Sequence, residues 1–538
     1  MANLKSLAKD TAIYGLSSII GRFLNYLLVP LYTAKLAAAS GGYGIITNIY
    51  AYTALIMVIL LFGMETTFFR FANKEGENPH RVYSTTLITV GTLALTFIVL
   101  VLLFIKPLSQ TMGYADHPQY IWVMAITVGI DAFSAIPFSY LRYQKRPLKF
   151  ASLKLLNIAL NITMNLIYFA VINGKDVGYA FYINLACSSI LLCCLCKELS
   201  GFRWIFDREL FRRMFHYAWP LLVLSIAGIL NQTADKILFP YIYTASDAHA
   251  QLGIYGAASK IAMIMAMITQ AFSYAYEPFV FGKAREKDSK EMYAQAMKYF
   301  IIFTLLAYLA VIAYLDILRY IIGSDYWEGL RVVPIVMAAE IMMGIYFNLS
   351  FWYKLIDKTI WGAIFSGIAC FVLVAVNVIF VPRYGYMACA WGGFSGYFTC
   401  MALSYLVGRK KNPINYPLKD IALYVVFAAL LMMLMLMLTY YMSNRIETHM
   451  DEFKKAQTLY NYEDNVDFKD VPWALKIPTK YFQYPLEGCQ IGFRKRTEDG
   501  TPAMFGAYMT LGHSFGEWVE DSRNCLDWYQ YPTANQVW

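Results

Sequence analysis

Long apolar runs alternate with short polar segments along most of the chain. A helix needs about 20 apolar residues to cross a bilayer, and thirteen windows of the sequence approach or exceed that length. We predict membrane-spanning helices over residues 11–36, 44–68, 83–105, 119–140, 150–172, 178–196, 215–241, 253–280, 297–316, 331–353, 360–381, 386–407 and 421–442. Recurrent apolar runs of this length are typical of an all-α polytopic membrane protein.

Basic residues are distributed unevenly between the loops that these spans define. Of the 35 Lys and Arg residues before residue 443, 25 lie at the N-terminus or in loops after even-numbered spans, and seven lie in the other loops. Cytoplasmic loops of membrane proteins are enriched in Lys and Arg, so the N-terminus is predicted to be cytoplasmic. The remaining three cations lie inside spans and are Arg22, Lys154 and Lys260.

The two halves of the sequence resemble each other. LVPLYT at 28–33 is similar to LFPYIYT at 238–244, and the Tyr43-Gly44 pair that follows is similar to Tyr255-Gly256. NLIYF at 165–169 is likewise similar to NVIFV at 377–381. The offset is about 210 residues, or six spans, each time. An even number of spans preserves orientation, so we expect two parallel six-helix lobes around a central cavity, a design typical of transporters.

This repeat divides the chain into five segments. We predict an N-terminal six-helix lobe at 1–200, a basic cytoplasmic linker at 201–213, a C-terminal six-helix lobe at 214–409, an additional transmembrane helix at 410–442 and a polar tail of unknown role at 443–538. The tail carries a net charge of −4, whereas residues 1–442 carry +13. Its composition therefore separates it from the membrane part.

Composition excludes a soluble protein and offers no sign of catalysis. The chain is 59% hydrophobic and 15% charged, and its start, MANLKSLAKD, is followed by no cleavage site, so the first helix is expected to be retained. None of the six histidines lies in the middle of a span, which predicts neither a metal centre nor an enzyme. Seven cysteines lie in apolar spans, where we interpret them as buried small hydrophobic residues: Cys187, Cys193, Cys194, Cys196, Cys370, Cys389 and Cys400.

Arg22, together with Asn25, lies near the middle of the first span. An arginine at that depth is costly unless it faces protein or a water-filled cavity. Two interpretations remain open. Either an acid on a neighbouring helix neutralises Arg22, or Arg22 lines a path for an anionic substrate, because a guanidinium matches phosphate oxygens in charge and geometry.

Lys154 and Lys260 are the other cations that could bind an anionic substrate. Lys154 lies close enough to the cytoplasmic end of its span to snorkel instead. Asn157 and Asn161 follow Lys154 at helical spacing and place a polar stripe on one helix face. The stripe either makes polar contacts between helices or lines a hydrated cavity that faces a sugar. We predict a substrate site formed by Arg22, Asn25, Lys154, Asn157, Asn161 and Lys260.

Three acids within spans are candidates for ion coupling. Asp131 and Glu340 lie mid-span, where an acid either pairs with a cation or carries a coupling H⁺ or Na⁺. Asp235 adjoins Lys236 in the polar segment NQTADK. A local charge pair with Lys236 is the first interpretation of Asp235, and ion coupling is the second.

Several segments resemble the bacterial polysaccharide-unit flippases. They are DTAIYGLSSIIGRFLNYLLVPLYT at 10–33, GGYGI at 41–45, FGMETTFFRF at 62–71, LRYQKRPLKFASLKLLNIALNITMNLIY at 141–168, LGIYGAASKIA at 252–262 and FWYKLIDKT at 351–359. This family belongs to a superfamily that also contains lipid II flippases and multidrug and toxin extrusion pumps. The resemblance covers about residues 8–440.

The resemblance implies an activity and a place in the cell. It implies a protein of the bacterial inner membrane that flips an undecaprenyl-pyrophosphate-linked oligosaccharide from the cytoplasmic to the periplasmic leaflet by alternating access, for O-antigen, capsule or exopolysaccharide assembly. Other polysaccharide-assembly proteins and membrane lipid are the expected partners, and nucleic acid is not. No cofactor is expected apart from a coupling H⁺ or Na⁺.

The C-terminal region departs from the family pattern, and two other functions were weighed. Members of this branch usually have fourteen spans and a short tail, whereas this chain has thirteen predicted spans and 96 further residues. A multidrug or cation antiporter of the same superfamily would need a cavity dominated by acids, whereas these spans carry both signs. A membrane polysaccharide polymerase or ligase would need a large external loop with catalytic groups, which only the tail could supply.

Overall fold

The computed structural model describes residues 24, 26–200, 205–283, 289–356, 358, 360–459, 481–486, 489–496 and 502–504. Arg22 and Asn25, two predicted site residues, lie outside the described residues. The chain forms two compact units, one up to Leu430 and one from Leu431 onward. The expected division of the first unit into two lobes of six helices stays a prediction, because the first unit is a single compact body by its contacts.

The first half of the described chain is helical. Its elements are α2 (Leu28–Lys35), η1 (Ala38–Ser40), α3 (Gly42–Leu61), α4 (Met64–Ala72), α5 (Pro79–Leu103), α6 (Ile105–Thr111), α7 (Pro118–Tyr143), α8 (Pro147–Asn165), η2 (Leu166–Val171), α9 (Gly178–Cys194) and α10 (Cys196–Ser200). Helices α5 and α7 pack together, α9 packs on α7 and α8, and α3 packs on α7.

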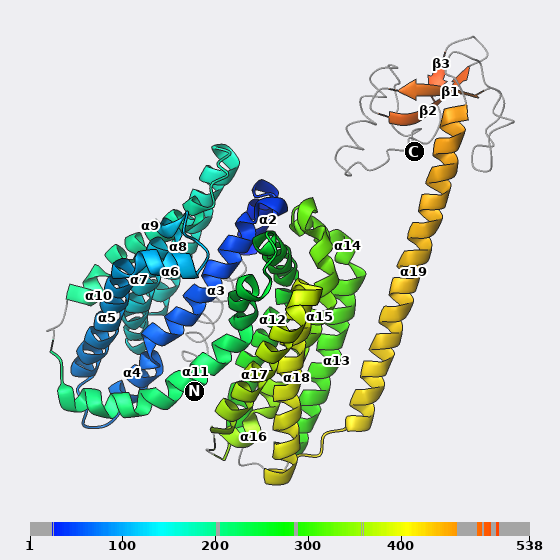
Figure 1. Ribbon diagram of the computed structural model, residues 1–538. Coiled ribbons are helices and arrows are strands. Elements are labelled where there is room, and N and C mark those ends of the chain that lie inside the picture. Colours follow the sequence, from blue (N-terminus) through cyan, green and yellow to red (C-terminus); the bar gives the residue numbers. More distant parts are fainter. Residues whose placement is uncertain are drawn as a thin grey trace. The chain divides into compact units, whose positions relative to one another are not determined.

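The second half of the first unit is also helical. Its elements are α11 (Arg208–Ile242), α12 (Ala248–Lys283), α13 (Ser289–Ala313), α14 (Leu315–Leu318), η3 (Arg319–Ile321), η4 (Ser324–Val332), α15 (Val333–Leu349), α16 (Phe351–Lys354), α17 (Ile360–Tyr384) and α18 (Tyr386–Lys411). Helix α18 packs on α15 and α17, and α12 packs on α13 and α15. Figure 1 shows α11 extending from the foot of the first group of helices to the second, and α11 contacts members of both.

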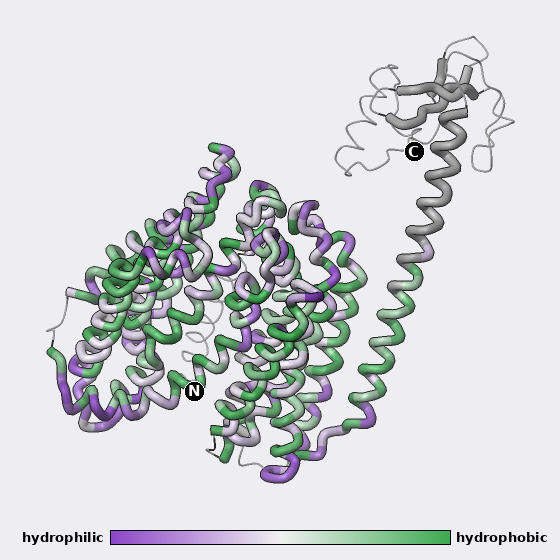
Figure 2. The backbone as a smooth tube through the Cα atoms, in the orientation of Figure 1, coloured by the Kyte–Doolittle hydropathy of each residue, from purple (hydrophilic) through white to green (hydrophobic). Residues whose placement is uncertain are grey.

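Polar residues at the ends of these helices explain where several of them begin. Asn78 caps α5 by accepting a hydrogen bond from the His80 N–H at 2.9 Å, and Pro79 occupies the first helical position. Asp207 caps α11 by accepting hydrogen bonds from the N–H groups of Glu209 and Leu210. Figure 2 shows hydrophobic residues along the middle of most helices and hydrophilic residues gathered near their ends. This distribution fits helices that cross an apolar layer.

Ten described helical segments are long and apolar enough to cross a membrane. They correspond to ten of the thirteen predicted spans. The span predicted at 178–196 forms the shorter apolar helix α9, and the one predicted at 386–407 forms α18, which is a helix of ample length but lower hydropathy. Most of the span predicted at 11–36 lies outside the described residues. The all-α membrane fold is therefore confirmed.

The second predicted span is broken near one end. Helix α3 ends at Leu61 and α4 starts at Met64, because the two residues between them, Phe62 (φ 49°) and Gly63 (φ 65°), both adopt the left-handed conformation. Such a φ is unfavourable for a bulky residue such as phenylalanine. The Phe62 ring stacks on Phe215 of α11, with 5.1 Å between the ring centroids. Packing against α11 thus supports a break that the apolar pattern does not reveal.

Three cysteines do not match the sequence interpretation. Cys187, Cys389 and Cys400 are buried and Cys370 is partly buried, whereas Cys193, Cys194 and Cys196 are exposed. The exposed group lies where α9 ends and α10 begins, so these side chains project from a helix terminus that no described neighbour covers. An apolar sequence context alone does not distinguish burial in protein from exposure on the surface of a membrane helix.

The second unit comprises the end of a long helix and a small sheet. Helix α19 (Leu418–Leu459) starts in the first unit and continues past residue 442, where the polar tail was expected to begin. Strands β1 (Tyr481–Leu486), β2 (Cys489–Arg496) and β3 (Pro502–Met504) form an antiparallel sheet in that order. The sequence analysis did not predict these strands.

Candidate functional site

The polar side chains inside the helices form two groups. The N-terminal polar cluster contains Asp131, Lys154, Asn157 and Asn161. The C-terminal polar cluster contains Asp235, Lys236, Lys260 and Glu340. The first cluster is formed by the consecutive helices α7 and α8, and the second by α11, α12 and α15. Both clusters contain acids and cations together.

Asp131 and Lys154 lie close enough for their charges to interact. The Asp131 carboxylate, on α7, is also in hydrogen-bond contact with Ser188 on α9. The Lys154 Nζ lies 4.3 Å from the centroid of the Phe138 ring, a favourable cation–π distance. Lys154 also interacts electrostatically with Glu65, which pairs with Arg142 at 3.7 Å. Its ammonium therefore lies between one acid in the middle of a span and one near a helix end.

The asparagine stripe on α8 belongs to a network that we call the asparagine network: Tyr32, Tyr50, Asn161, Asn165 and Asn184. Asn161 donates to the Asn184 side chain, which donates to the Tyr50 hydroxyl. Asn165 donates to Asn161, and the Tyr32 hydroxyl donates to Asn165 Oδ1 at 2.7 Å. The network joins α2, α3, α8 and α9. It uses the amides of Asn161 and Asn165 for contacts between helices.

Asn157 differs from the rest of the stripe. Its Oδ1 is buried and has no hydrogen-bond partner among the described residues. Of the stripe predicted from sequence, Asn157 is thus the member whose amide is available to a ligand, and Asn161 is already engaged.

Asp235 in the C-terminal polar cluster makes the local pair expected from sequence. It is only 5% exposed, and Lys236 Nζ lies 3.0 Å from its Oδ2. The Tyr255 hydroxyl of α12 donates to the same oxygen at 2.7 Å. Glu340 on α15 interacts electrostatically with Lys236 as well. Lys236 therefore interacts with two acids, Asp235 and Glu340.

Lys260 has different surroundings. It lies on α12 within the same cluster, and no described side chain or carbonyl pairs with its ammonium. The charge that acts on it is that of Lys236, which is repulsive. A cation within a helical bundle that lacks an anionic partner is a favourable site for an anionic ligand.

The structure brings together some of the predicted site residues and separates others. Asp131 and Lys154 interact, and Asp235 and Glu340 share Lys236. The two described cations of the predicted substrate site, Lys154 and Lys260, do not contact each other. The sequence analysis did not identify Tyr50, Asn184 and Tyr255 as site residues. Their roles become visible only in the structure, where each makes a hydrogen bond to a residue on another helix.

The N-terminal ends of α3 and α12 meet in a close backbone contact that we call the seal: Gly41, Gly44, Thr47, His249, Gly253 and Gly256. A Cβ added to Gly44 would lie 1.8 Å from the His249 carbonyl oxygen, so only glycine allows this approach. A Cβ on Gly256 would lie 2.5 Å from Thr47 Oγ1. Gly44 and Gly256 are the glycines of the repeated Tyr-Gly pair, so both copies of that motif lie in the seal.

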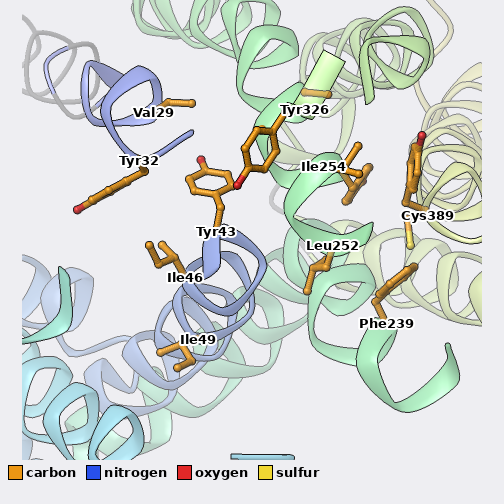
Figure 3. Close-up of a cluster of buried hydrophobic side chains, with 14 of the residues drawn as sticks. Val29, Tyr32, Tyr43, Ile46, Ile49, Phe239, Leu252, Ile254, Tyr326 and Cys389 are labelled. Carbon is orange, nitrogen blue, oxygen red and sulfur yellow. The ribbon is translucent and has the colours of Figure 1, made fainter. Parts of the chain in front are cut away.

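Hydrogen bonds and aromatic rings surround the seal. Tyr43 and Tyr326 pack edge to face with 5.9 Å between ring centroids, and Figure 3 shows them between α3 and the helices around Ile254. The Tyr326 hydroxyl donates to the Leu36 carbonyl at 2.6 Å. Asn48 Nδ2 donates to the Lys236 carbonyl at 2.7 Å. The two halves of the first unit are therefore closed against each other at this end.

A family comparison identifies the chain. A model of the family described as polysaccharide biosynthesis protein matches residues 7–279, just over half of the sequence. The chain belongs to this family. Lsg locus protein 1 of Haemophilus influenzae is 19% identical to this polysaccharide biosynthesis protein over 338 residues, which is 59% of the chain and 77% of that relative.

Two solved structures share the fold of this polysaccharide biosynthesis protein. The lipid II flippase MurJ in an inward closed conformation superimposes with a TM-score of 0.63 at 15% identity, over 78% of the chain and 91% of MurJ. An inward-facing multidrug resistance transporter of the MATE family and MOP superfamily gives a TM-score of 0.57 at 16% identity, over 74% and 94%. The fold expected from the resemblance is confirmed by these two structures.

Proposed function

We propose that the protein flips a polyprenyl-pyrophosphate-linked oligosaccharide from the cytoplasmic to the periplasmic leaflet of the bacterial inner membrane, by alternating access and without catalysis. The observation that carries the proposal is Lys260, an interior cation with no described counter-ion. The family membership, the fold shared with a lipid II flippase and the bias of basic residues toward one side support it.

The residues would divide the work between ligand and ion. Lys260 and Lys154, with Arg22 and Asn25 from the first span, would bind the pyrophosphate. Asn157, whose amide oxygen has no described partner, would face the sugars, and Asn161 would hold α8 against α9. Asp131, Asp235 and Glu340 would carry a coupling H⁺ or Na⁺. Each of these acids interacts with a lysine, and a bound H⁺ or Na⁺ could neutralise the carboxylate in place of that lysine. The lipid tail would remain in the bilayer, and other polysaccharide-assembly proteins would receive the product.

The test is export in a deletion strain. Deleting the gene should make lipid-linked units accumulate on the cytoplasmic leaflet, and the wild-type protein should restore export. Lys260→Ala should reduce export at least about tenfold, because one charge-assisted hydrogen bond contributes roughly 1.5–3 kcal/mol. Lys106→Ala, which removes an exposed lysine on α6, is the matched control and should export normally. Normal export by Lys260→Ala, or a deletion without accumulation, would refute the proposal.

Arg22 is tested by double substitution. If it binds pyrophosphate, Arg22→Ala combined with Asp131→Asn or Glu340→Gln should stay inactive, and Arg22→Lys should rescue in part. If Arg22 only neutralises an acid, the double variants should regain both folding and export. Both acids already have a lysine within electrostatic reach, Lys154 and Lys236 respectively, which favours the first outcome.

A further inference from the structure

One ionisable side chain in the seal has no role in the proposed transport site. His249 is the second residue of α12, and its Nδ1 is buried without a hydrogen-bond partner among the described residues. A Cβ added to Gly41 would lie 2.8 Å from the His249 Cβ, and the His249 carbonyl faces Gly44. The imidazole is therefore held where α3 and α12 meet.

The neighbours of His249 offer no negative charge to it. The centroid of its ring lies 5.5 Å from that of the Tyr114 ring. The Tyr114 hydroxyl donates a hydrogen bond to Asn48 Oδ1 at 2.7 Å. On its own helix segment, the Asp247 carboxylate accepts a hydrogen bond from Gln251. No described carboxylate interacts electrostatically with the imidazole.

Several other titratable groups near this end, on the elements that pack against α12, have partners of their own, whereas Asp325 and Arg331 of η4 are exposed. These pairs are Lys35 of α2 with Asn173, Tyr43 of α3 with the Tyr326 ring, Lys236 of α11 with Asp235, Tyr326 of η4 with the Leu36 carbonyl, and Tyr386 of α18 with Glu328. None of these described groups is placed to accept a proton from His249 or to neutralise its cation.

Protonation of His249 would therefore act against the closed seal. His249 is partly exposed, but its Nδ1 atom is buried, so a proton added to Nδ1 creates a charged N–H donor that has no described acceptor. Once α3 and α12 separate, water can solvate the imidazolium. We propose that His249 makes the seal a proton-operated latch, which is closed when His249 is neutral and is released when it is protonated. Histidine is the side chain whose ordinary titration falls between about pH 5 and about pH 8.

The latch concerns conformation and does not depend on which substrate is carried. Its failure and the failure of the proposed function are therefore separate outcomes. With the orientation proposed above, the seal faces the periplasm, so acidification of that compartment would favour opening toward it.

A distance measurement across the seal tests the latch. Spin labels at Ala39→Cys and Ser246→Cys, both exposed positions, would report the separation of the two halves in a background whose native cysteines are replaced. Between about pH 8 and about pH 5.5, a longer-distance population should grow at the expense of the short one. The ratio of the two should change by up to about tenfold per pH unit, the limit for one proton.

Two histidine variants make the test specific. His249→Gln keeps a polar side chain but cannot acquire the proton, so its distance distribution should not depend on pH. His117→Gln is the matched control, since His117 is an exposed histidine at the same end, stacked on Tyr120 at 4.8 Å, and this variant should respond like the parent. If His249→Gln does not fold, His249→Asn replaces it. A parent that shows no pH response, or a response that survives removal of His249, would overturn the latch.

Discussion

Lys236 and Lys260 show how much the role of a lysine depends on its immediate partners. Lys236 is bound to Asp235 and interacts with Glu340, whereas Lys260 has no described counter-ion and is repelled by Lys236. Removing one member of a buried ion pair leaves the other charge uncompensated, which is strongly destabilising. Removing a cation that has no partner relieves a desolvation cost instead.

We therefore expect opposite effects on stability from the same substitution at these two positions. Lys260→Met should leave the thermal unfolding midpoint in detergent unchanged or raise it by a few degrees. Lys236→Met should lower it, because Asp235 would then be a buried carboxylate that lacks its cation. Thermal unfolding followed by fluorescence measures both. A drop in midpoint for Lys260→Met equal to that for Lys236→Met would show that Lys260 has a structural partner.

The asparagine network predicts a second contrast between similar residues. Asn184→Leu removes the acceptor of Asn161 and a donor to Tyr50, so it should destabilise the fold by about 1–3 kcal/mol for each group left unpaired. Asn157→Leu removes an amide oxygen that has no described partner and should cost less or nothing. Chemical unfolding of the two variants compares them. Equal losses would mean that the network does not hold α8 and α9 together.

Individual site residues could be predicted from sequence where their position along a span is unusual. Lys154, Lys260, Asp131 and Glu340 are ionisable groups in apolar runs, and all four lie on helices with only part of their surface exposed. Asn184 and Tyr50 carry no such signal, since a single polar residue is common in membrane helices. Their role depends on Asn161, which lies 23 residues from Asn184 in sequence. No local pattern encodes that distance.

At the scale of elements, the contact between α3 and α12 depends on what glycine lacks. The Gly44 backbone lies against the His249 carbonyl, and Gly253 faces the Gly44 N–H, with 3.0 Å between that nitrogen and a Cβ added to Gly253. The sequence marks this place through the repeated Tyr-Gly pair, but it does not show that the two copies touch. Contact between repeats is a property of how the helices pack, which apolar periodicity leaves open.

Gly44→Ala should push the two helices apart at the seal. The added methyl would lie 1.8 Å from the His249 carbonyl oxygen, closer than any real contact, so the backbone must move. We expect the spin-label pair at residues 39 and 246 to show a larger open population at every pH. Gly393→Ala on α18 is the matched control, because no atom lies within 4 Å of its added Cβ. Identical distance distributions in Gly44→Ala and the parent would argue against a closed contact here.

At the scale of the whole molecule, the apolar pattern predicted the membrane part far better than the remainder. Ten of thirteen predicted spans appear as helices with the expected length and hydropathy. The break at Phe62 and the strands β1 to β3 were not predicted. Both depend on contacts between segments distant in sequence, whereas a membrane helix satisfies its own backbone hydrogen bonds and so reveals itself locally.

The part of the second unit that follows residue 443 should be dispensable for folding of the first unit. The first unit is compact by its own contacts, and the chain divides from it at Leu431. Truncation after Ser443 should leave expression, membrane insertion and thermal stability near the full-length values. Fluorescence-detected gel filtration and thermal unfolding measure these quantities. A collapse in the yield of folded protein would show that residues beyond 443 support the membrane part.

The contact between α3 and α12 at the seal is made by glycines, so substitution at these positions can only add a side chain. Every substitution at Gly44, Gly253 or Gly256 adds atoms that push the two helices apart. No substitution at these positions can bring the helices closer together. Compensation has to come from the facing helix. For a wedge at Gly256 the facing atoms belong to Thr47, whose Oγ1 and Cγ2 a change to glycine would remove. A genetic screen that begins with a harmful residue at 256 should therefore recover revertants at 47.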